Sequence, residues 1–436
     1  MKHINIYEFL KSHRASVAVV GLGYVGLPLA LELSKHFNVV GYDSCSDTID
    51  SISDILPPPD HIGESGHINE GNLAVVKTTE GIADASFYII AVGTPVDSNH
   101  NPDINHLLSA TATVGRLLKP GDYVVYESTV FPGCTEEECV PLLEKISGLK
   151  CGHDFKVGYS PERINPGDAS HVFANTPKII SGCDDEAAAE IARVYGSAIS
   201  ARLHVAHSIR SAEAAKLLEN IQRCVNIALI NEMSKTFAKM GIDTNEVIKL
   251  AASKWNFTEY SPGLVGGHCI PVDPYYLIAE ASRAGIDMPL TRMGCAVNES
   301  MPDYVADSVA TRIRQTGHDG RRPRVLVLGI AYKRNSDDIR NSGVVEMIAR
   351  LLSHGIECDV VDEMADSEAV KRMYGIELLP EPSGVYDAVI VAVDHDCYAN
   401  LDEKWFESVS VGADTLLADL CGTFRGKVSN LKYWTL

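Results

Sequence analysis

The chain has 436 residues, of which 45% are hydrophobic and 22% are charged. These proportions are those of an ordinary water-soluble globular protein, and the length predicts two or three domains. The formal net charge of −20 at pH 7 argues against nucleic acid or an anionic membrane as the main partner, because both would repel an acidic surface. An anionic ligand would need a local group of Lys, Arg or helix N-termini to hold it.

Eleven cysteines are spread along the chain without a Cys-x-x-Cys pair, so the sequence indicates neither a zinc ribbon nor a disulfide framework. Reduced thiols in a cytoplasmic enzyme without a bound metal are the simpler interpretation. Residues 1–15 contain no unbroken apolar segment and no small-residue cleavage site, and glycines and a proline interrupt the apolar run from Val17 to Leu33. We therefore expect a cytoplasmic protein with no membrane span.

A glycine-rich motif, Gly-x-Gly-x-x-Gly over residues 21–26, follows the first predicted strand, residues 17–20. An apolar helix is predicted after the motif and continues through Phe37, and the second predicted strand, residues 39–42, ends in Asp43. In this context the glycines allow a tight turn and a close approach of pyrophosphate, and Asp43 would bind the adenosine ribose and favour NAD over NADP. A βα turn without a ligand is the alternative. The predicted NAD-binding residues here are Gly21, Gly23, Tyr24, Val25, Gly26 and Asp43.

Two later strands of the predicted parallel sheet end in hydroxyl residues. Thr94 follows the strand at residues 86–92, and Ser128 and Thr129 follow the strand at residues 122–126. Ligands of such sheets lie beyond the carboxyl ends of the strands. These side chains are therefore expected either at the cofactor or substrate, or as caps of the strand ends.

Charged and amide side chains mark the middle of the chain. Glu162 comes shortly after a buried strand and is a candidate acid–base group, although an isolated glutamate more often lies in a solvated loop. A long helix is predicted over residues 209–240, in which Glu213, Lys216 and Asn220 share one face at i, i+3 and i+7. Lysines on a helix face usually point to solvent, so this line of residues is a candidate for function only in the context of the other motifs.

The segment at residues 264–276 places Cys269 just after a Gly-Gly pair and four residues before Asp273. Glycine lets the backbone approach a ligand closely, and a thiolate in such a position is a nucleophile. The alternative is a buried cysteine in a tight turn, since free cysteine is among the most buried residue types. The dinucleotide motif and the second α/β half of the chain favour the nucleophile.

A second α/β unit is predicted after a polar hinge at residues 317–323. It repeats the alternation of strands and helices but has no Gly-x-Gly-x-x-Gly motif, so we expect it to bind something other than a second dinucleotide. Lys333, Arg334 and Arg340 cluster at the end of its first strand and are suited to phosphate. The predicted elements of this unit are strands at 324–333, 357–361 and 386–393 and a helix at 344–354.

Six motifs follow one another along the chain: GLGYVGLPLA (21–30), ESTVFPG (127–133), YSPERINPG (159–167), EAAKLLEN (213–220), GLVGGHCIPVDPYYL (263–277) and LGIAYKRNSDDIRNS (328–342). Together they make the chain similar to the UDP-sugar 6-dehydrogenase superfamily over nearly its whole length. Several motifs in one order are far more specific than any one of them. Within the superfamily, the third and fifth motifs resemble the branch that oxidises UDP-N-acetylglucosamine (UDP-GlcNAc) or UDP-N-acetylgalactosamine (UDP-GalNAc).

The resemblance implies an α/β fold with two Rossmann-like, doubly wound parallel-sheet domains. A long central helix and a helical dimerisation domain would join them, so a homodimer or a higher homo-oligomer is expected. The implied divisions are an NAD-binding domain at 1–205, a central helical domain with the cysteine loop at 206–316, and a UDP-sugar-binding domain at 317–436.

The resemblance also implies a four-electron oxidation. Cys269 would attack the aldehyde formed at sugar C6 to give a thiohemiacetal, a second NAD would oxidise it to a thioester, and water would hydrolyse the thioester. The other implied roles are stabilisation of the oxyanion by Lys216 and Asn220, uptake of the hydroxyl proton by Asp273 with ordered water or Lys216, and activation of the hydrolytic water by Glu162 with Thr129.

Further binding residues follow from the same resemblance. Lys333 would meet the UDP phosphates, and Arg340 would lie on the NAD side. The residues implied for the substrate are Glu162, Arg163, Lys216, Asn220, Tyr260, Gly263, Gly266 and Lys333, and those implied for the cofactor beyond the glycine motif are Thr94, Thr129 and Arg340.

The sequence departs from the UDP-glucose enzymes of the superfamily. They usually carry a second carboxylate four residues after the one that matches Glu162, where this chain has Pro166. UDP-GlcNAc and UDP-GalNAc are therefore the expected donors, with UDP-N-acetylmannosamine (UDP-ManNAc) or UDP-glucose as alternatives. Two other readings stay open: a two-electron dehydrogenase that needs no cysteine, and a non-catalytic sugar-nucleotide sensor.

Overall fold

The computed structural model describes residues 5–55, 67–68, 72–164, 172–316 and 320–436, which form two compact units. The first unit comprises Met1–Glu219 and Tyr275–Ile286, and the second comprises Asn220–Pro274 and Asp287–Leu436. The long helix α7 (Ile209–Met240) passes from the first unit into the second after Glu219. Pro166 and residues 317–319 of the predicted hinge lie outside the described residues.

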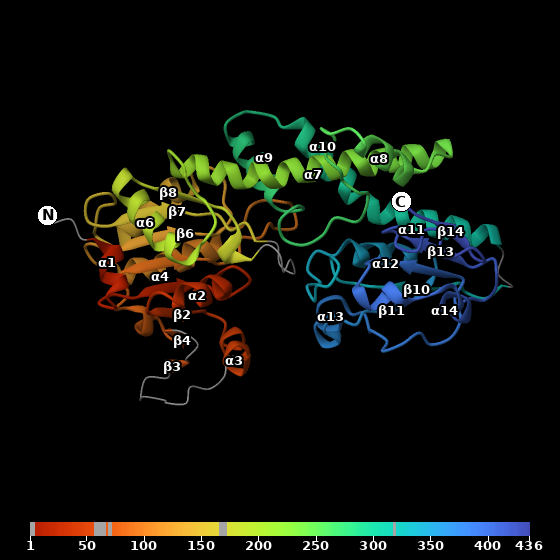
Figure 1. The fold of residues 1–436 in the computed structure, drawn as a ribbon, viewed down its shortest axis with the longest axis horizontal. Coiled ribbons are helices and arrows are strands. Elements are labelled where there is room, and N and C mark those ends of the chain that lie inside the picture. The colour runs from red at the N-terminus through yellow and green to blue at the C-terminus, as the bar shows by residue number, and fades with distance from the viewer. Residues whose placement is uncertain (1–4, 56–66, 69–71, 165–171, 317–319) are drawn as a thin grey trace. The chain divides into compact units, whose positions relative to one another are not determined.

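A nine-stranded sheet forms the centre of the first unit within the described residues (Figure 1). Its order is β3-β4-β2-β1-β5-β6-β7-β8-β9; β3 pairs antiparallel with β4 and β8 with β7, and the other pairs are parallel. The strands are β1 (Val17–Val20), β2 (Val39–Tyr42), β3 (His67–Ile68), β4 (Leu73–Val76), β5 (Phe87–Ile90), β6 (Tyr123–Tyr126), β7 (Lys156–Tyr159), β8 (Lys178–Gly182) and β9 (Leu203–Val205).

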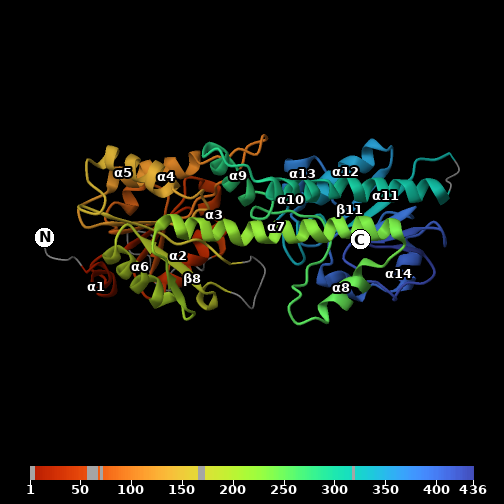
Figure 2. The same ribbon diagram turned by 90° about the horizontal axis from the view of Figure 1, so that it is seen from above.

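Helices cover both faces of this sheet, with α4 and α5 on one face and α2 and α6 on the other (Figure 2). Strands enclosed in this way are apolar throughout, and all four residues of β1, β5 and β6 are buried. The helices are α1 (Ile6–Lys11), α2 (Gly26–Ser34), α3 (Ser46–Ile55), α4 (Asn105–Leu117), α5 (Val140–Ser147) and α6 (Asp185–Ala198), with short helical turns at Thr79–Ile82, Thr135–Cys139 and Phe173–Asn175.

The second unit contains a five-stranded parallel sheet in the order β11-β10-β12-β13-β14. Its strands are β10 (Arg324–Leu328), β11 (Glu357–Val361), β12 (Ala388–Val391), β13 (Leu416–Asp419) and β14 (Lys432–Trp434). The remaining helices are α8 (Thr244–Ala252), α9 (Asp273–Arg283), α10 (Pro289–Glu299), α11 (Met301–Thr316), α12 (Gly343–Ser353), α13 (Ser367–Tyr374) and α14 (Glu403–Ser408), with a short turn at Asp396–Asn400. Of these, α9 passes into the first unit after Pro274.

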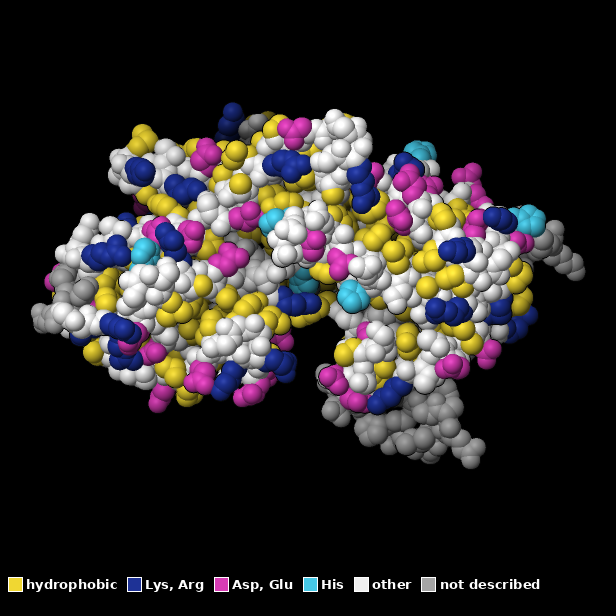
Figure 3. Space-filling model, turned by 180° about the vertical axis from the view of Figure 1, so that it is seen from behind, with side chains coloured by type: hydrophobic (Ala, Val, Ile, Leu, Met, Phe, Trp, Pro, Cys, Tyr) yellow, Lys and Arg dark blue, Asp and Glu magenta, His cyan; other side chains and the backbone are white. Residues whose placement is uncertain are grey.

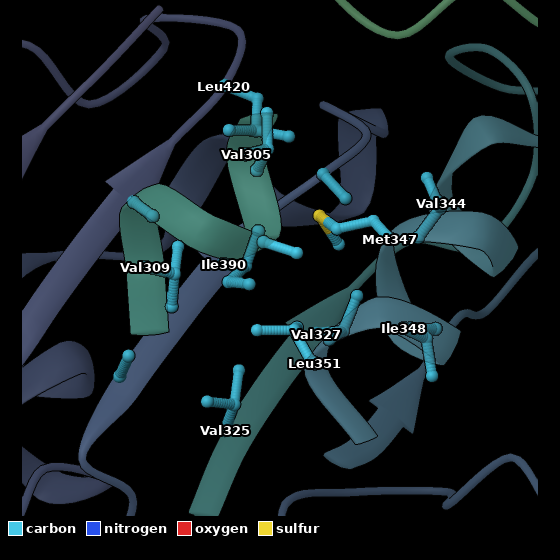
Figure 4. Packing of buried hydrophobic residues seen from close by; sticks show 14 of the residues in the cluster. Val305, Val309, Val325, Val327, Val344, Met347, Ile348, Leu351, Ile390 and Leu420 are labelled. Atoms are coloured by element: carbon cyan, nitrogen blue, oxygen red, sulfur yellow. The ribbon is translucent and has the colours of Figure 1, made fainter. Parts of the chain in front are cut away.

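Alternate residues of β10 and β12 enter two different cores of the second unit. Val325, Val327 and Ile390 pack with α11 and α12, where Met347 and Leu351 fill the space above the strands (Figure 4). The residues between them in the strands pack on the opposite face with the α14 side of the sheet. This period of two is that of a strand buried on both faces.

The α/β fold with two parallel sheets and a long central helix confirms the expectation from the sequence. The predicted helix at 209–240 coincides with α7. The helix after the glycine motif was expected to continue to Phe37, but α2 ends at Ser34. Strands β3, β4, β8, β9, β13 and β14 were not predicted, because none of them carries a motif.

The surface mixes charges of both signs. On the face shown in Figure 3, Lys and Arg side chains lie among Asp and Glu side chains on both units. Among the helices in the described part of the chain, none combines the length and the apolar character needed to cross a bilayer.

The core of the second unit provides a stability prediction. Leu351→Ala should lower the free energy of unfolding by about 3 kcal/mol, because Leu351 is fully buried between α12 and the sheet. The neighbouring Leu352 is 53% exposed, so Leu352→Ala should change the free energy by less than about 0.5 kcal/mol. The chain's three tryptophans, at 255, 405 and 434, all lie in the second unit, so urea unfolding followed by their fluorescence measures both variants. Equal destabilisation by the two would contradict this packing.

Candidate active site

The loop after β1 has room for a ligand at one glycine and none at the other two. A Cβ on Gly26 would lie 1.7 Å from the Gly21 carbonyl oxygen, and one on Gly21, whose φ is +95°, would lie 2.8 Å from the Ala91 oxygen. A Cβ on Gly23 would meet no atom of the described residues within 4 Å. The loop lies where β1 separates β2 from β5, the switch point at which such sheets bind ligands.

Asp43, which directly follows β2, is hydrogen-bonded to the backbone of this loop. Its carboxylate accepts hydrogen bonds from the backbone N–H of Leu22 at 2.8 Å and of Cys45 at 2.9 Å, and its side chain remains partly exposed. Tyr24 is exposed, and Val25 directly precedes α2 without capping it by a side chain. The geometry thus fits an NAD pyrophosphate at the loop and a ribose at Asp43.

The hydroxyl residues after β5 and β6 tie these strand ends together. The Thr94 hydroxyl donates to the Thr129 carbonyl at 2.7 Å, and the Ser128 hydroxyl donates to the Val92 carbonyl at 2.7 Å. Thr94 and Ser128 therefore cap the backbone, one of the two roles expected from the sequence. Thr129 is partly exposed, and its backbone is fixed by the bond from Thr94.

Glu162 is not solvated but lies in a buried ionic network. Lys178, the first residue of β8, places its Nζ 2.6 Å from Glu127 and 3.1 Å from Glu162. The second oxygen of Glu162 accepts bonds from the backbone N–H of Arg163 at 2.6 Å and of Ile164 at 2.5 Å. Sequence reasoning missed Lys178, since no motif or spacing connects it with its partners.

Glu127 is the protonatable member of this network. Its burial outweighs the charge of Lys178 and raises the pKa of Glu127 to about 7, and the nearby Glu162 carboxylate contributes. The Tyr195 hydroxyl donates to the other Glu127 oxygen at 2.6 Å. Burial also raises the pKa of Tyr195, so Tyr195 remains a donor at neutral pH.

The beginning of α7 presents three charged residues to the rest of the first unit. Glu213 is fully buried and accepts bonds from the backbone N–H of Gly133 at 2.6 Å and Thr135 at 3.0 Å. Its role is thus to fix the end of the 127–133 motif. Lys216, one turn later, is 8% exposed. Arg163 pairs with Glu219 at 2.7 Å and donates to the Pro177 carbonyl.

In the second unit, Asn220 and Asp273 are brought together. Both side chains are buried, and the Asn220 amide donates to the Asp273 carboxylate at 2.5 Å. Arg223 donates to the Asn220 oxygen at 2.7 Å and so fixes the orientation of the amide. The Asp273 backbone N–H donates to the Cys269 carbonyl at 2.8 Å. Cys269 itself is exposed, which excludes the alternative of a buried structural cysteine.

The glycines before Cys269 are required by close neighbours within the second unit. A Cβ on Gly266 would lie 2.7 Å from the Asn341 carbonyl oxygen, and one on Gly267, whose φ is +82°, would lie 2.8 Å from the Tyr332 ring. The Asn341 amide donates to the Gly267 carbonyl at 3.0 Å. The cysteine loop is therefore fastened to the segment that follows β10.

Two other predicted positions in this loop are anchored to α7. The Asn231 amide and the Gly263 backbone exchange two hydrogen bonds, at 2.8 and 3.1 Å. Tyr260 donates to Gln222 at 3.3 Å. Asn231 carries no motif signal in the sequence, but a buried asparagine in an apolar helix is the kind of position that marks a polar anchor.

The cations after β10 do not form one cluster. Arg334 pairs with Asp394 and Asp396, and Arg340 pairs with Asp338 at 2.9 Å. Arg340 also contacts the Nε2 of His268, the residue before Cys269, at 2.5 Å. The Lys333 ammonium lies 5.4 Å from the centre of the Tyr332 ring. Arg334 and Arg340 of the expected phosphate cluster are thus paired with carboxylates.

The predicted residues are divided between the two units. The first unit holds Gly21, Gly23, Tyr24, Val25, Gly26, Asp43, Thr94, Thr129, Glu162, Arg163 and Lys216, and the second holds Asn220, Tyr260, Gly263, Gly266, Cys269, Asp273, Lys333 and Arg340.

Comparison with known proteins identifies three matching domains. The NAD binding domain of the UDP-glucose/GDP-mannose dehydrogenase family matches residues 15–199, its central domain residues 210–300 and its UDP binding domain residues 326–425. Protein CapL of Staphylococcus aureus is 44% identical over 88% of this chain and 90% of its own, and the UDP-N-acetyl-D-glucosamine 6-dehydrogenase of Salmonella typhi is 43% identical over 89% and 92%. The solved UDP-D-ManNAc dehydrogenase of Pyrococcus horikoshii has a TM-score of 0.83 at 29% identity, covering 96% of this chain and 98% of its own.

Substitutions at two glycines of the first loop should affect NAD binding and folding separately. Gly23→Ala should leave folding unchanged and weaken NAD binding about tenfold or more, because the new methyl group would occupy the open space beside the loop. Gly26→Ala should destabilise the first unit, because its Cβ would overlap the Gly21 carbonyl. Fluorescence titration with NADH and thermal melting measure the two effects. Wild-type affinity in Gly23→Ala would contradict the placement of the pyrophosphate.

The buried Glu127 predicts a pH dependence of stability. Between its ordinary value of 4.5 and about 7 the folded chain retains a proton that the unfolded chain loses, so the stability due to the protonated carboxyl is lost as the pH rises through this window. Glu127→Gln lacks this loss and should gain stability relative to wild type between pH 5 and pH 8. Thermal unfolding followed by circular dichroism measures the difference. The exposed Glu138→Gln serves as the control, and a difference independent of pH would contradict the prediction.

Proposed function

Because this chain belongs to the UDP-glucose/GDP-mannose dehydrogenase family, we propose that it oxidises C6 of a UDP-N-acetylhexosamine to the uronic acid, with two NAD per sugar. UDP-GlcNAc is the first candidate donor, supported by the 43% identical Salmonella typhi enzyme of that specificity. UDP-GalNAc differs only at C4 and is the second candidate. UDP-ManNAc is an alternative donor, because the similar solved structure from Pyrococcus horikoshii is that of a UDP-D-ManNAc dehydrogenase.

The observation that carries the proposal is an exposed thiol on a loop that is held in place by a hydrogen bond and by packing. Cys269 is exposed, its backbone is held by Asp273, and the glycines before it pack against Tyr332. A thiol held in this way can attack an aldehyde at C6 and keep it bound between two oxidations. Bound NAD supplies the hydride acceptor for each oxidation. A two-electron dehydrogenase would need no such nucleophile.

The other groups move protons and stabilise charge. Asp273, whose carboxylate is oriented by Asn220, takes the proton of the C6 hydroxyl with ordered water or Lys216. Lys216 and the Asn220 amide then stabilise the oxyanion by charge and by N–H donation. After the second oxidation, Glu162 with Thr129 orients and deprotonates the water that hydrolyses the thioester.

The proposal also assigns the residues that bind the substrate. Lys333 interacts with the UDP phosphates, and Arg163 lies with Glu162 at the sugar. Arg340 contributes on the cofactor side. The backbone around Tyr260, Gly263 and Gly266 lines the sugar nucleotide, and the division into domains at residues 205 and 316 belongs to the same proposal.

We also infer a cytoplasmic homodimer, or a higher homo-oligomer, that supplies a surface-polysaccharide precursor. The exposed leucine and methionine side chains of α7, such as Leu218, Leu229 and Met240, support a partner surface along this helix, because an apolar stripe on a long helix favours association. Sedimentation of the purified chain tests the oligomer.

The stoichiometry of NADH tests the mechanism. With UDP-GlcNAc, UDP-GalNAc, UDP-ManNAc and UDP-glucose assayed in parallel, the preferred donor should give about two NADH per sugar consumed. Cys269→Ser should abolish this sustained four-electron turnover, because serine cannot form the thioester. Cys397→Ser, at another exposed thiol of the second unit, should behave as wild type.

Other outcomes identify the competing functions. One NADH per sugar, unchanged in Cys269→Ser, would indicate a two-electron dehydrogenase. Tight UDP-sugar binding without NADH from any donor would indicate a sensor.

A further inference from the structure

Lys178 is a fully enclosed charge that the proposed reaction does not use. It is 3% exposed and its Nζ lies between Glu127 and Glu162, with the rings of Phe173 and Tyr195 at 5.0 and 5.6 Å. An ammonium removed from water is costly unless paired, and this one is paired twice. Fold stability alone does not require a buried ammonium here, since apolar residues of similar volume often stabilise such positions as well or better.

The contacts of Glu162 indicate what the pairing achieves. An ionised carboxylate has about four acceptor positions. The described residues account for three of them: two backbone N–H groups on Oε1 and Lys178 on Oε2. The plane of the carboxylate is therefore fixed, and the contacts within the described part of the chain leave one acceptor position on Oε2.

The second carboxylate of the network, Glu127, is the one whose pKa is raised. Two neighbouring carboxylates do not ionise equally, and the proton favours the one that is worse solvated. Glu127 is fully buried and its pKa is raised to about 7, first by burial. Lys178 and the two N–H donors contact the Glu162 carboxylate directly, so its two oxygens are held in one orientation.

We propose that Lys178 is a positioning residue for thioester hydrolysis, which holds the Glu162 carboxylate in place with Oε2 directed to the attacking water. This inference rests on the proposed function. In the step, the water oxygen bonds to C6 of the Cys269 thioester and one water proton passes to Glu162. The C–S bond breaks, its electron pair returns to Sγ, which takes the second water proton, and the product leaves as a carboxylate.

The first unit offers a matched control for Lys178. Lys156, on the neighbouring strand β7, also pairs with two carboxylates, Asp184 at 2.5 Å and Glu186 at 3.1 Å. These distances are nearly those of the Lys178 pairs, but neither partner of Lys156 is a proposed catalytic residue. Lys156→Met thus reproduces the loss of a doubly paired lysine without changing Glu162.

The test is rapid mixing of NAD, the preferred UDP-sugar and each variant. Lys178→Met should release about two NADH per active site in a burst and then turn over at least ~100-fold more slowly than wild type, because only hydrolysis loses its oriented base. Intact-protein mass spectrometry should show the sugar acyl group on Cys269 during the slow phase. Lys156→Met should show neither the burst nor the adduct.

Lys178→Met leaves two carboxylates facing each other in the protein interior, which can prevent folding. The double variant Lys178→Met/Glu127→Gln removes one of these charges with the lysine, and the same burst and adduct are expected from it.

The controls distinguish two kinds of failure. Wild-type turnover by either Lys178 variant, or loss of the first NADH without an adduct, would overturn the role of Lys178. Wild-type enzyme that yields one NADH per sugar, or none, would instead overturn the proposed function.

Discussion

Both units depend on one constraint. Neighbouring backbone segments approach one another closely at the carboxyl ends of the central strands. In the first unit Gly21 lies so close to Ala91 that a Cβ would be 2.8 Å from a carbonyl oxygen, and in the second unit a Cβ on Gly329 would be 2.5 Å from Val393. Both glycines have positive φ and follow the strand at which the order of the sheet reverses. The tight turn positions the loop beyond it, where a ligand can bind.

The two units share this arrangement but differ in the surroundings of the aspartate that follows the second strand. Asp43 and Asp362 both end the second strand of their sheet and accept a backbone N–H from the loop after the first strand. Asp43 is partly exposed, whereas Asp362 is buried against His395. Although burial opposes its ionisation, the bonds from His395 and the backbone lower the pKa of Asp362 to about 2. Asp362 thus maintains the loop, while Asp43 can also bind a ribose.

Local sequence patterns predicted the elements that carry their own periodicity or motif. The strand–glycine–helix segment at 17–34 and the helix α7 were recognised because apolar spacing and glycine position are local signals. Lys178 was not recognised, since its partners Glu127 and Glu162 lie 51 and 16 residues away. Gly266 and Gly267 were singled out from the sequence as glycines that let a ligand approach. The structure adds that Asn341 and Tyr332 of a distant segment leave no room for a Cβ at either position.

The buried carboxylates of this chain respond to their immediate hydrogen-bond donors more than to the net charge of the protein. Each buried acid near a proposed site has its own donors: Glu213 two backbone N–H groups, Glu162 two more and Lys178, and Asp273 the Asn220 amide. Interactions at hydrogen-bond distance in a poorly solvated site are far stronger than those with screened surface charges. In a protein of charge −20, burial and immediate neighbours can therefore still raise the pKa of one carboxylate, as they do for Glu127, and acid–base chemistry depends on such local control.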